Sequence, residues 1–278
     1  MLPAAAGPGA VLPSPALLPP SQNALAGVHE PLSHAAETAL WRGTELGGPV
    51  SDVLTSGFAE LDAVLPGGGW PCGSSTEVLV RQFSVVEMRL LAHVIAAQTR
   101  RGRTVALVGP SLAPHAPGLR HEGVDERHLV WVDVDTPRDR LWATEQLIKA
   151  GTFGAIVSWL SHVRAEQIRR LQVLSSRCKG PVFLCRPEVA ARDSSAAPLR
   201  VLARVETDWQ LAVQVLKRKG AQLEETLLLP SVPGGLLKIM TERLRHPSRL
   251  QPVEPANVVV RPAAAAHQRP QVAATSQH

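Results

Sequence analysis

Short apolar runs alternate with amphipathic segments along the middle of the chain. Five of the runs are rich in β-branched residues and are bounded by glycine, proline or charge: 76–80, 104–108, 129–134, 155–160 and 182–185. Runs of this length and composition are typical of the buried strands of a parallel sheet. Segments 85–100, 137–149 and 165–176 carry apolar residues three and four positions apart, which predicts the helices that connect such strands.

After residue 199 the pattern changes to an alternation of apolar and polar positions. Segments 199–202, 211–216 and 225–229 are separated by short polar turns. This alternation predicts antiparallel strands that complete the sheet. The fold class expected from the whole pattern is α/β, with a mostly parallel sheet flanked by helices and antiparallel strands at its C-terminal end.

The two ends of the chain differ from this central region. Residues 1–28 hold no acidic or basic side chain and are interrupted repeatedly by proline, and residues 246–278 are dominated by proline, alanine and glutamine. Both compositions predict disordered tails, because neither offers a periodic apolar face to bury. Residues 29–48 favour a short helical segment that ends at two glycines. We therefore expect one core domain over residues 49–245.

The junction after the first predicted strand of the sheet lacks the residues of a phosphate-binding loop. Such a loop needs glycines between a strand and a helix, followed by a lysine and a hydroxyl. Here the glycines at 67–69 precede the strand, and the junction 80–87 has no glycine, no lysine and no hydroxyl at its end. Ser84 and Glu87 instead have the spacing of a capping box, which places a carboxylate at the positive end of the helix. No nucleotide cofactor is expected.

The predicted strand ends also lack a hydrolytic carboxylate. Two of them read Val-Gly-Pro at 108–110 and Ser-Trp-Leu at 158–160. Asp133 and Asp135 follow a third strand, but they precede a helix-start turn, where aspartate commonly caps a helix. The histidines are scattered without the spacing of a metal pair or a triad. We expect no catalytic residue and no metal site, so the chain is predicted not to be an enzyme.

Composition narrows the cellular setting. The formal net charge of +5 and the pI near 9.6 favour contact with an acidic partner such as nucleic acid. Three cysteines without a CxxC pair argue against a disulfide framework and a structural zinc site, which favours the reducing cytoplasm. Neither a signal peptide nor a run of about eighteen apolar residues is present, so no membrane contact is expected. Association with the nucleoid would be compatible with these features.

Positive charge concentrates in the second half of the predicted core. Residues 164–186 hold six basic residues against one acidic residue, Glu166. Three interpretations stay open: a solvated helix face, a surface that contacts DNA phosphates, and a surface for an acidic protein. The cationic turn at 217–219 is open to a simpler interpretation as a hairpin turn. The candidate DNA or partner surface comprises Arg164, Arg169, Arg170, Arg177, Lys179, Arg186, Arg192, Lys217, Arg218 and Lys219.

The tryptophans fall into two groups. Those at 41, 70, 131, 142 and 159 lie in or beside predicted elements, so most are expected to fill the core. Trp41 and Trp70 lie where the chain enters the domain and are candidate exposed anchors for a protein partner. The chain has no tyrosine and four phenylalanines, so a strong autonomous binder of single strands is not expected.

Several separated motifs, in order along the chain, carry a family resemblance. They are SGFAELDAVL at 56–65, GGGWP at 67–71, LWATEQ at 141–146, RRLQ at 169–172 and VLKRKG at 215–220. Over roughly residues 41–229 this pattern resembles the ImuA family, which is related to RecA and SulA. The resemblance implies a RecA-like core in which the junction 80–87 falls where the phosphate loop of RecA lies and has become degenerate.

The same resemblance places other sites. The catalytic glutamate of recombinases would fall near Pro110 and their metal-associated aspartate near Ser158, and both are replaced here. Residues 186–197, with Arg186 and Arg192, would lie where RecA has a mobile DNA-binding loop. Residues 217–219 would face the neighbouring subunit of a RecA filament.

The function that the resemblance implies is a non-catalytic scaffold in damage-induced (SOS) error-prone translesion DNA synthesis. Its implied partners are ImuB, which is a polymerase homologue, and an error-prone copy of the catalytic subunit of the replicative polymerase. RecA and DNA are further candidate partners. A cell-division inhibitor similar to SulA and an unconventional ATPase are the alternatives. The chain length and the GGGWP segment fit ImuA better than SulA.

Overall fold

The computed structural model describes residues 52–232 and 236–249, which lie in the unit Gly43–His278. The predicted tail 1–28 and the helical segment 29–48, which includes Trp41, lie outside the described residues. The predicted C-terminal tail does so beyond residue 249. None of the helices in the described part has the length and apolar character needed to cross a membrane.

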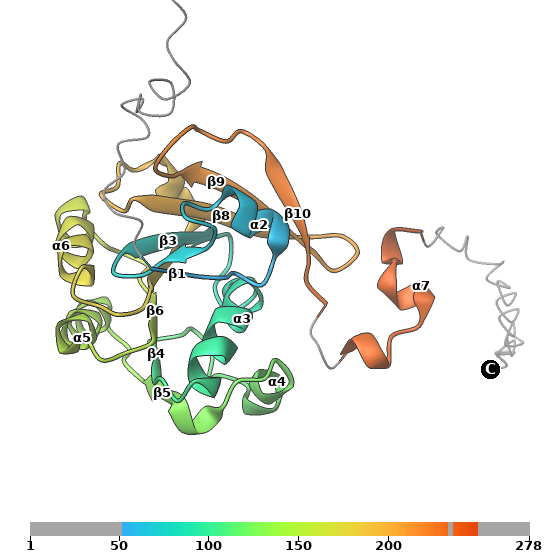
Figure 1. Ribbon diagram of the computed structural model, residues 1–278, viewed down its shortest axis with the longest axis horizontal. Helices are drawn as coiled ribbons and strands as arrows, with labels where there is room; N and C mark the ends of the chain where they lie inside the picture. Colours follow the sequence, from blue (N-terminus) through green and yellow to red (C-terminus); the bar gives the residue numbers. More distant parts are fainter. Residues whose placement is uncertain (1–51, 233–235, 250–278) are drawn as a thin grey trace, which may run out of the picture. The chain divides into compact units, whose positions relative to one another are not determined.

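An eight-stranded sheet forms the centre of this unit (Figure 1). Its strands are β3 (Ser75–Val80), β4 (Val105–Val108), β5 (Leu129–Val132), β6 (Ala155–Trp159), β7 (Val182–Pro187), β8 (Leu199–Glu206), β9 (Gln210–Lys217) and β10 (Thr226–Pro230). The order across the sheet is β10-β9-β8-β3-β7-β6-β4-β5. Neighbours from β8 to β5 are parallel, whereas β8, β9 and β10 pair antiparallel. The predicted fold class is therefore confirmed.

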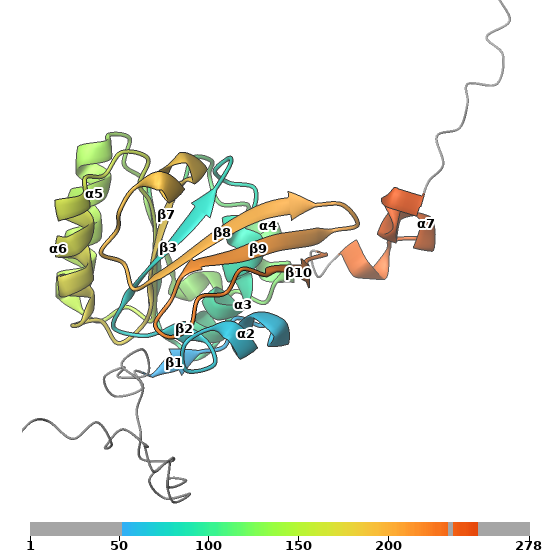
Figure 2. The same ribbon diagram turned by 90° about the horizontal axis from the view of Figure 1, so that it is seen from above.

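Three helices connect the parallel strands, as the apolar periodicity predicted. They are α3 (Glu87–Arg100), α5 (Pro137–Ala150) and α6 (Ala165–Ser175). Helices α5 and α6 lie side by side on one face of the sheet, and α3 lies on the other (Figures 1 and 2). Helix α5 ends at Gly151, whose φ of 66° is the left-handed conformation common at helix C-termini.

The remaining elements of the described part are short. They hold too few residues for a repeat of apolar positions to be detected in the sequence. The two-residue strands β1 (Val53–Leu54) and β2 (Trp70–Pro71) pair antiparallel. The short helices are α2 (Ala59–Val64), α4 (Ala116–His121), α7 (Glu242–Arg245), and the 3-10 turns η1 (Glu126–His128), η2 (Glu188–Arg192), η3 (Leu236–Lys238) and η4 (Pro247–Arg249).

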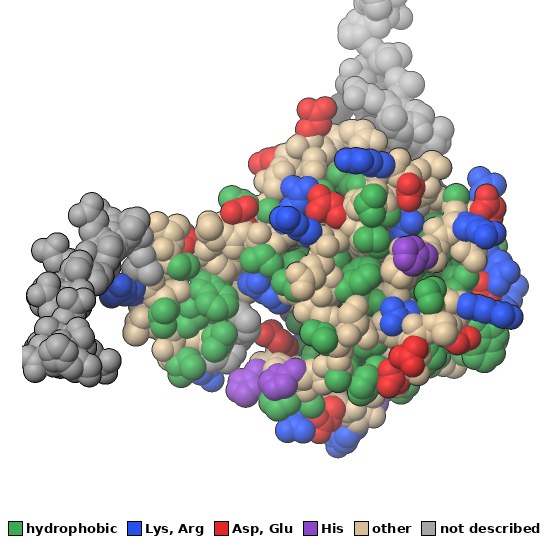
Figure 3. Space-filling model, turned by 180° about the vertical axis from the view of Figure 1, so that it is seen from behind, with side chains coloured by type: hydrophobic (Ala, Val, Ile, Leu, Met, Phe, Trp, Pro, Cys, Tyr) green, Lys and Arg blue, Asp and Glu red, His purple; other side chains and the backbone are tan. Residues whose placement is uncertain are grey.

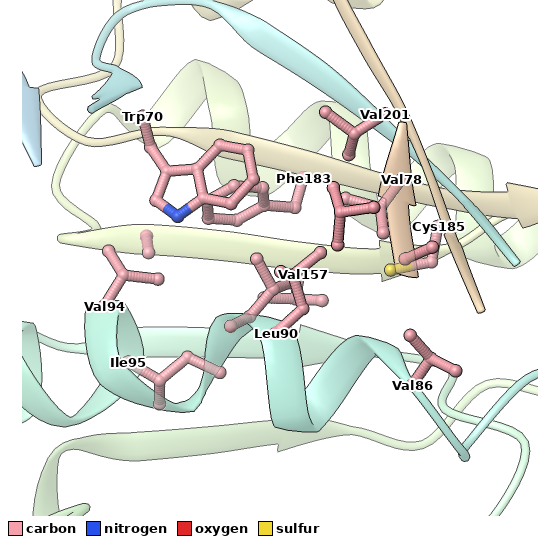
Figure 4. Packing of buried hydrophobic residues seen from close by; sticks show 14 of the residues in the cluster. Trp70, Val78, Val86, Leu90, Val94, Ile95, Val157, Phe183, Cys185 and Val201 are labelled. Carbon is pink, nitrogen blue, oxygen red and sulfur yellow. The ribbon is translucent and has the colours of Figure 1, made fainter. Parts of the chain in front are cut away.

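The largest apolar cluster lies between the sheet and α3. Figure 4 shows Leu90 of α3 beside Val157 of β6, and Trp70 beside Phe183 of β7. The Trp70 and Phe183 rings meet edge to face at 5.3 Å, and both side chains are fully buried. The prediction that Trp70 is an exposed anchor is therefore wrong, because the strand pair β1–β2 carries it into the core.

Two other tryptophans depart from their expected burial. Trp131 is 45% exposed and Trp142 is 62% exposed, whereas Trp159 is buried as predicted. Trp131 lies on β5, which is an edge strand of the sheet formed by the described residues and pairs there with β4. Trp142 lies on α5 two residues before the buried Thr144, on the side turned to solvent. An apolar side chain at an edge or on an outer helix face was not distinguishable from a core residue by its local pattern.

Gly180, just before β7, offers a test of the packing on the N-terminal side of the sheet. A Cβ atom at this position would lie 1.8 Å from the carbonyl oxygen of Gly154, a backbone atom that cannot rotate away. We expect Gly180→Ala to lower the free energy of unfolding by roughly 2–3 kcal/mol, measured by urea denaturation.

Gly68→Ala is the matched control for this substitution. Gly68 has φ of +83°, but no atom of the described residues lies within 4 Å of the place that a Cβ atom would take, so backbone strain of about 1 kcal/mol is the expected cost. Equal losses of stability in the two variants would contradict the proposed clash at Gly180.

Candidate functional site

The β3–α3 junction occupies the position expected for a phosphate loop. Strand β3 ends at Val80 and α3 begins at Glu87, so residues 81–86 form the connection. Ser84 has φ of +65°, a left-handed conformation that is uncommon for a residue with a Cβ atom. The turn at Ser84 brings backbone N–H groups of the connection toward the first residue of α3.

The carboxylate of Glu87 accepts those N–H groups. Its Oε1 accepts hydrogen bonds from the Ser84 N–H at 2.5 Å and from the Trp159 Nε1–H at 2.6 Å, and its Oε2 accepts one from the Val86 N–H at 3.1 Å. Glu87 is fully buried. The carboxylate therefore lies at the N-terminus of α3, where a phosphate would bind, and takes up two backbone N–H groups of the β3–α3 connection.

The predicted capping box is half correct. Glu87 accepts the N–H of Ser84, as expected, but the buried Ser84 Oγ has no hydrogen-bond partner among the described residues. The reason is that α3 begins at Glu87 itself and Val86 is its N-cap residue. The side chain of Ser84 therefore lies too early in the chain to reach a free N–H of the helix.

The surroundings of Glu87 also disfavour a second anion. Cys185 of β7 is fully buried, and burial raises the pKa of its thiol well above the ordinary value. The negative charge of Glu87 raises the pKa of this thiol further. A phosphate brought to the same place would be opposed by the same charge.

The tips of β4 and β6 supply no carboxylate. After β4, Gly109 adopts φ of +58° and Pro110 follows it. At the end of β6 the Ser158 hydroxyl is buried and hydrogen-bonds to the Thr144 hydroxyl of α5 at 2.5 Å. These are the positions at which the resemblance to recombinases placed the catalytic glutamate and the metal-associated aspartate.

The two aspartates after β5 do not cap α5 as expected. Asp133 and Asp135 are exposed, and the N-cap residue is Thr136, whose Oγ1 accepts the N–H of Asp139 at 3.1 Å. Threonine immediately precedes Pro137 at the first position of the helix, which is a favourable combination at a helix start.

A cavity of about 820 Å³ adjoins the β3–α3 junction. Its lining includes Ser84 and Trp159, residues of α3, the loop and helix 110–122, and residues near the end of β10. Most of its lining is apolar. Arg89 lines it and donates both Nε–H and Nη2–H to the carbonyl oxygen of Ser231.

A buried ionic cluster lies on the opposite face of the sheet, across β3, β7 and β8. Glu77 is fully buried and accepts hydrogen bonds from Arg186 Nη1 at 2.8 Å and from Arg200 Nε at 2.5 Å. Arg186 is 4% exposed. The prediction that Arg186 belongs to an open cationic surface is therefore wrong in this respect, because its charge is held in the core by Glu77.

The same cluster anchors the segment after β7. Arg200 donates to the carbonyl oxygens of Ala190 and Asp193, at 2.6 and 3.0 Å. The Ser195 hydroxyl donates to Glu77 at 2.9 Å, and Lys217 Nζ donates to the Ser195 carbonyl at 2.7 Å. The segment that the resemblance likened to a mobile DNA-binding loop is thus tied to the sheet through side-chain hydrogen bonds.

The remaining candidate cations divide into two groups. Lys217 and Arg218 are half-buried and donate to backbone carbonyls, including that of Val64 for Arg218, so they hold the fold together. Arg170 pairs with the buried Glu145 of α5. The exposed ones without a side-chain partner among the described residues are Arg164, Arg169, Arg177, Lys179, Arg192 and Lys219.

Two further residues near these cations were not among the predicted site residues. Arg138 at the start of α5 and His162 after β6 line a second cavity of about 710 Å³, together with Arg164 and Arg186. They lie far apart in sequence, and only the parallel arrangement brings them to one end of the sheet. The sequence did predict a helix that starts at Pro137. This prediction places Arg138 in the first turn of that helix and could have pointed to it as a site residue.

Comparison with known proteins gives a partial likeness. Two curated proteins similar to this chain are RecA from Acholeplasma laidlawii and RecA from Acholeplasma laidlawii strain PG-8A. Each is 33% identical to the chain over 106 residues, which cover 38% of this chain and 32% of the RecA protein. The chain thus spans about a third of the length of the curated relatives that it matches. No family model matches it.

The architecture agrees with this likeness. A mostly parallel sheet flanked by helices, with antiparallel strands at its C-terminal end, fits a RecA-like core. The chain is therefore RecA-like in its core architecture, with sequence similarity to RecA over part of its length.

Proposed function

We propose that this protein is a non-catalytic RecA-like accessory of damage-induced (SOS) error-prone translesion DNA synthesis, of the kind represented by ImuA. The observation that carries the non-catalytic part is the Glu87 carboxylate, which lies at the start of α3 and accepts the N–H groups of Ser84 and Val86 just before the helix. The role in translesion synthesis rests on the sequence resemblance to ImuA, and the partial likeness to RecA is compatible with it.

In this proposal the protein works through contacts. The partners are an ImuB-like polymerase homologue and an error-prone copy of the replicative polymerase's catalytic subunit, with RecA as a further partner. A core that does not cycle between nucleotide states would bind these partners with an affinity that ATP does not change. This independence from nucleotide separates the proposal from an unconventional ATPase.

Nucleotide binding is tested by thermal unfolding of the full chain with saturating Mg²⁺-ATP. A ligand that binds only the native state raises the melting temperature by mass action. We expect a change of less than about 1 °C, because the Glu87 carboxylate already accepts two backbone N–H groups of the junction and its charge opposes a phosphate there. RecA measured under the same conditions is the positive control. A clear, concentration-dependent rise for this chain would support the unconventional ATPase instead.

The partners are tested by co-purification of the tagged full chain with the ImuB-like protein, with and without ATP. RecA and the cell-division ring protein are offered in the same mixture as competitors. We expect capture of the ImuB-like protein at equal yield in both conditions. Capture of the division protein in its place would favour the inhibitor similar to SulA and would contradict the proposed role.

A further inference from the structure

The outer side of the helix pair α5 and α6 carries two large apolar side chains. Figures 1 and 2 show these helices side by side on one face of the sheet. Trp142 of α5 is 62% exposed and Val173 of α6 is 67% exposed. Trp142 lies two positions before the buried Thr144, which is about 200° around the helix, so its indole is turned away from the core. The outer side of the pair therefore presents apolar surface.

The spacing of these two apolar side chains matches one face of a third helix. Helices α5 and α6 run in the same direction, because they connect the parallel strands β5, β6 and β7 in turn. The ion pair between Glu145 of α5 and Arg170 of α6 places these two residues at one level. Trp142 lies three residues before this level and Val173 three residues after it, a separation of about 9 Å along the helix axes. Positions i and i+7 of a helix are about 10.5 Å apart along its axis.

Unpaired cations surround the two apolar side chains. Four basic residues on these helices or directly after α6 are exposed, and their side chains have no ion pair or hydrogen bond within the described residues: Arg138, Lys149, Arg169 and Arg177. The exposed acids on the two helices are Asp139 and Glu166. Figure 3 shows Lys and Arg side chains beside hydrophobic ones, with fewer acidic ones, along the right edge of the view, which is the side of α5 and α6. The outer side of the pair is therefore both apolar and positively charged.

We propose that the outer side of α5 and α6 docks an amphipathic helix of a partner protein, with apolar residues on one side and acidic residues beside them. The apolar residues of that helix contact Trp142 and Val173, and its carboxylates pair with the surrounding cations. Tryptophan and arginine are enriched among the residues that dominate the binding energy of protein interfaces. This inference goes beyond the proposed function, because it does not depend on which protein supplies the helix.

A helix of another protein fits this surface better than a nucleic acid or a second copy of this chain. A nucleic acid offers phosphates to the cations, but it has no apolar side chain for Val173. A second copy lacks a suitable helix within the described residues. On α3, α5 and α6, the long helices of that part, the exposed acids are Asp139 and Glu166, and both belong to the proposed surface itself. The complementary charge therefore has to come from a different protein.

The probe for this surface is a fluorescently labelled peptide of about 18 residues, with leucines at positions i, i+4, i+7 and i+11, glutamates beside them and alanines elsewhere. A control peptide has the same composition, but its leucines are distributed around the helix. Fluorescence anisotropy during titration with the full chain measures the affinity of both. We expect the amphipathic peptide to bind at least about tenfold more tightly, because its leucines reach Trp142 and Val173 together.

Variants of the chain locate the binding on this surface. We expect Trp142→Ala to weaken binding of the amphipathic peptide roughly tenfold and Trp142→Phe to retain most of it. Arg169→Glu should weaken binding roughly three- to fivefold at low salt, and less at about 0.5 M salt, where exposed charges are screened. Both positions are exposed, and unchanged melting temperatures of the variants verify the fold.

Matched controls separate this surface from general charge and aromatic effects. Trp131→Ala removes another exposed tryptophan, on strand β5, and Lys219→Glu reverses an exposed cation outside α5 and α6. Both variants are expected to bind the amphipathic peptide as the wild type does. Equal affinity for the two peptides, or wild-type affinity in Trp142→Ala, would overturn the site. An oligonucleotide that binds more tightly than the amphipathic peptide, with the same loss in Trp142→Ala, would overturn the assignment to a protein helix.

Discussion

Replacing Glu77 by alanine is expected to lower the free energy of unfolding by about 3–5 kcal/mol. The substitution leaves the Arg186 and Arg200 guanidinium groups in the core without the carboxylate that both of them contact. A buried charge without a partner costs far more than the pair itself contributes to stability. Urea denaturation monitored by circular dichroism measures the loss.

Two comparisons make the interpretation specific. Glu225→Ala, which removes an exposed carboxylate just before β10, should change stability by less than about 0.5 kcal/mol. The apolar triple variant Glu77→Leu, Arg186→Met, Arg200→Leu should recover most of the stability lost in Glu77→Ala, because it leaves no buried charge at this cluster. A triple variant that is less stable than Glu77→Ala would show that these side chains hold the segment after β7 by their hydrogen bonds instead.

Replacing Glu87 by alanine is also expected to cost about 3–5 kcal/mol, for a different reason. The N–H groups of Ser84 and Val86 and the indole N–H of Trp159 all donate to this carboxylate. Without it, three donors lose their acceptor, and each such loss costs about 1–3 kcal/mol before relaxation. The same urea titration measures the effect.

An added anion should partly replace the missing carboxylate. Three donors at a helix N-terminus form the kind of site at which sulfate or phosphate binds. Millimolar sulfate should therefore raise the melting temperature of Glu87→Ala more than that of the wild type, with chloride at equal ionic strength as the reference. An equal rise in both proteins would be the general salt effect and would contradict the idea that Glu87 occupies an anion site.

The degree to which the fold was predictable varied with the length of each element. The runs that became β3 to β7 and the helices α3, α5 and α6 were predicted within one or two residues at most ends, because apolar residues repeat along each of them with a clear period. The strands β1 and β2, two residues each, have no period to detect. Their pairing, which buries Trp70, joins Trp70 to Leu54 across the intervening helix α2 and was not predicted.

The candidate site was predictable where it depends on neighbours in sequence. Ser84 and Glu87 are three residues apart, so the contact between the Ser84 N–H and the Glu87 carboxylate followed from their spacing. Trp159, the third donor to Glu87, comes from a strand 72 residues later, and no local pattern indicated it.

The charged residues also have partners that are distant in the sequence and that no local pattern predicts. Arg164 and Arg186 carry the same charge in one basic stretch, but Arg164 is exposed and Arg186 is buried against Glu77, which lies 109 positions away. Residues 217–219 were likewise interpreted as a cationic turn, whereas Lys217 donates to the carbonyl oxygen of Ser195. Which cations remain open for a ligand depends on partners that the local sequence does not contain.

The sequence by itself determined the α/β class, the parallel strands with their connecting helices, and the absence of a glycine-lysine phosphate loop between β3 and α3. These properties are local, since they depend on periodicity and on residue types within one segment. The tertiary structure alone decided that Trp70 is buried, that Trp142 is open, and that Arg138, Arg164 and Arg186 line one cavity. Burial and charge pairing are set by the packing of distant segments, because the free energy of a side chain depends on what surrounds it in space.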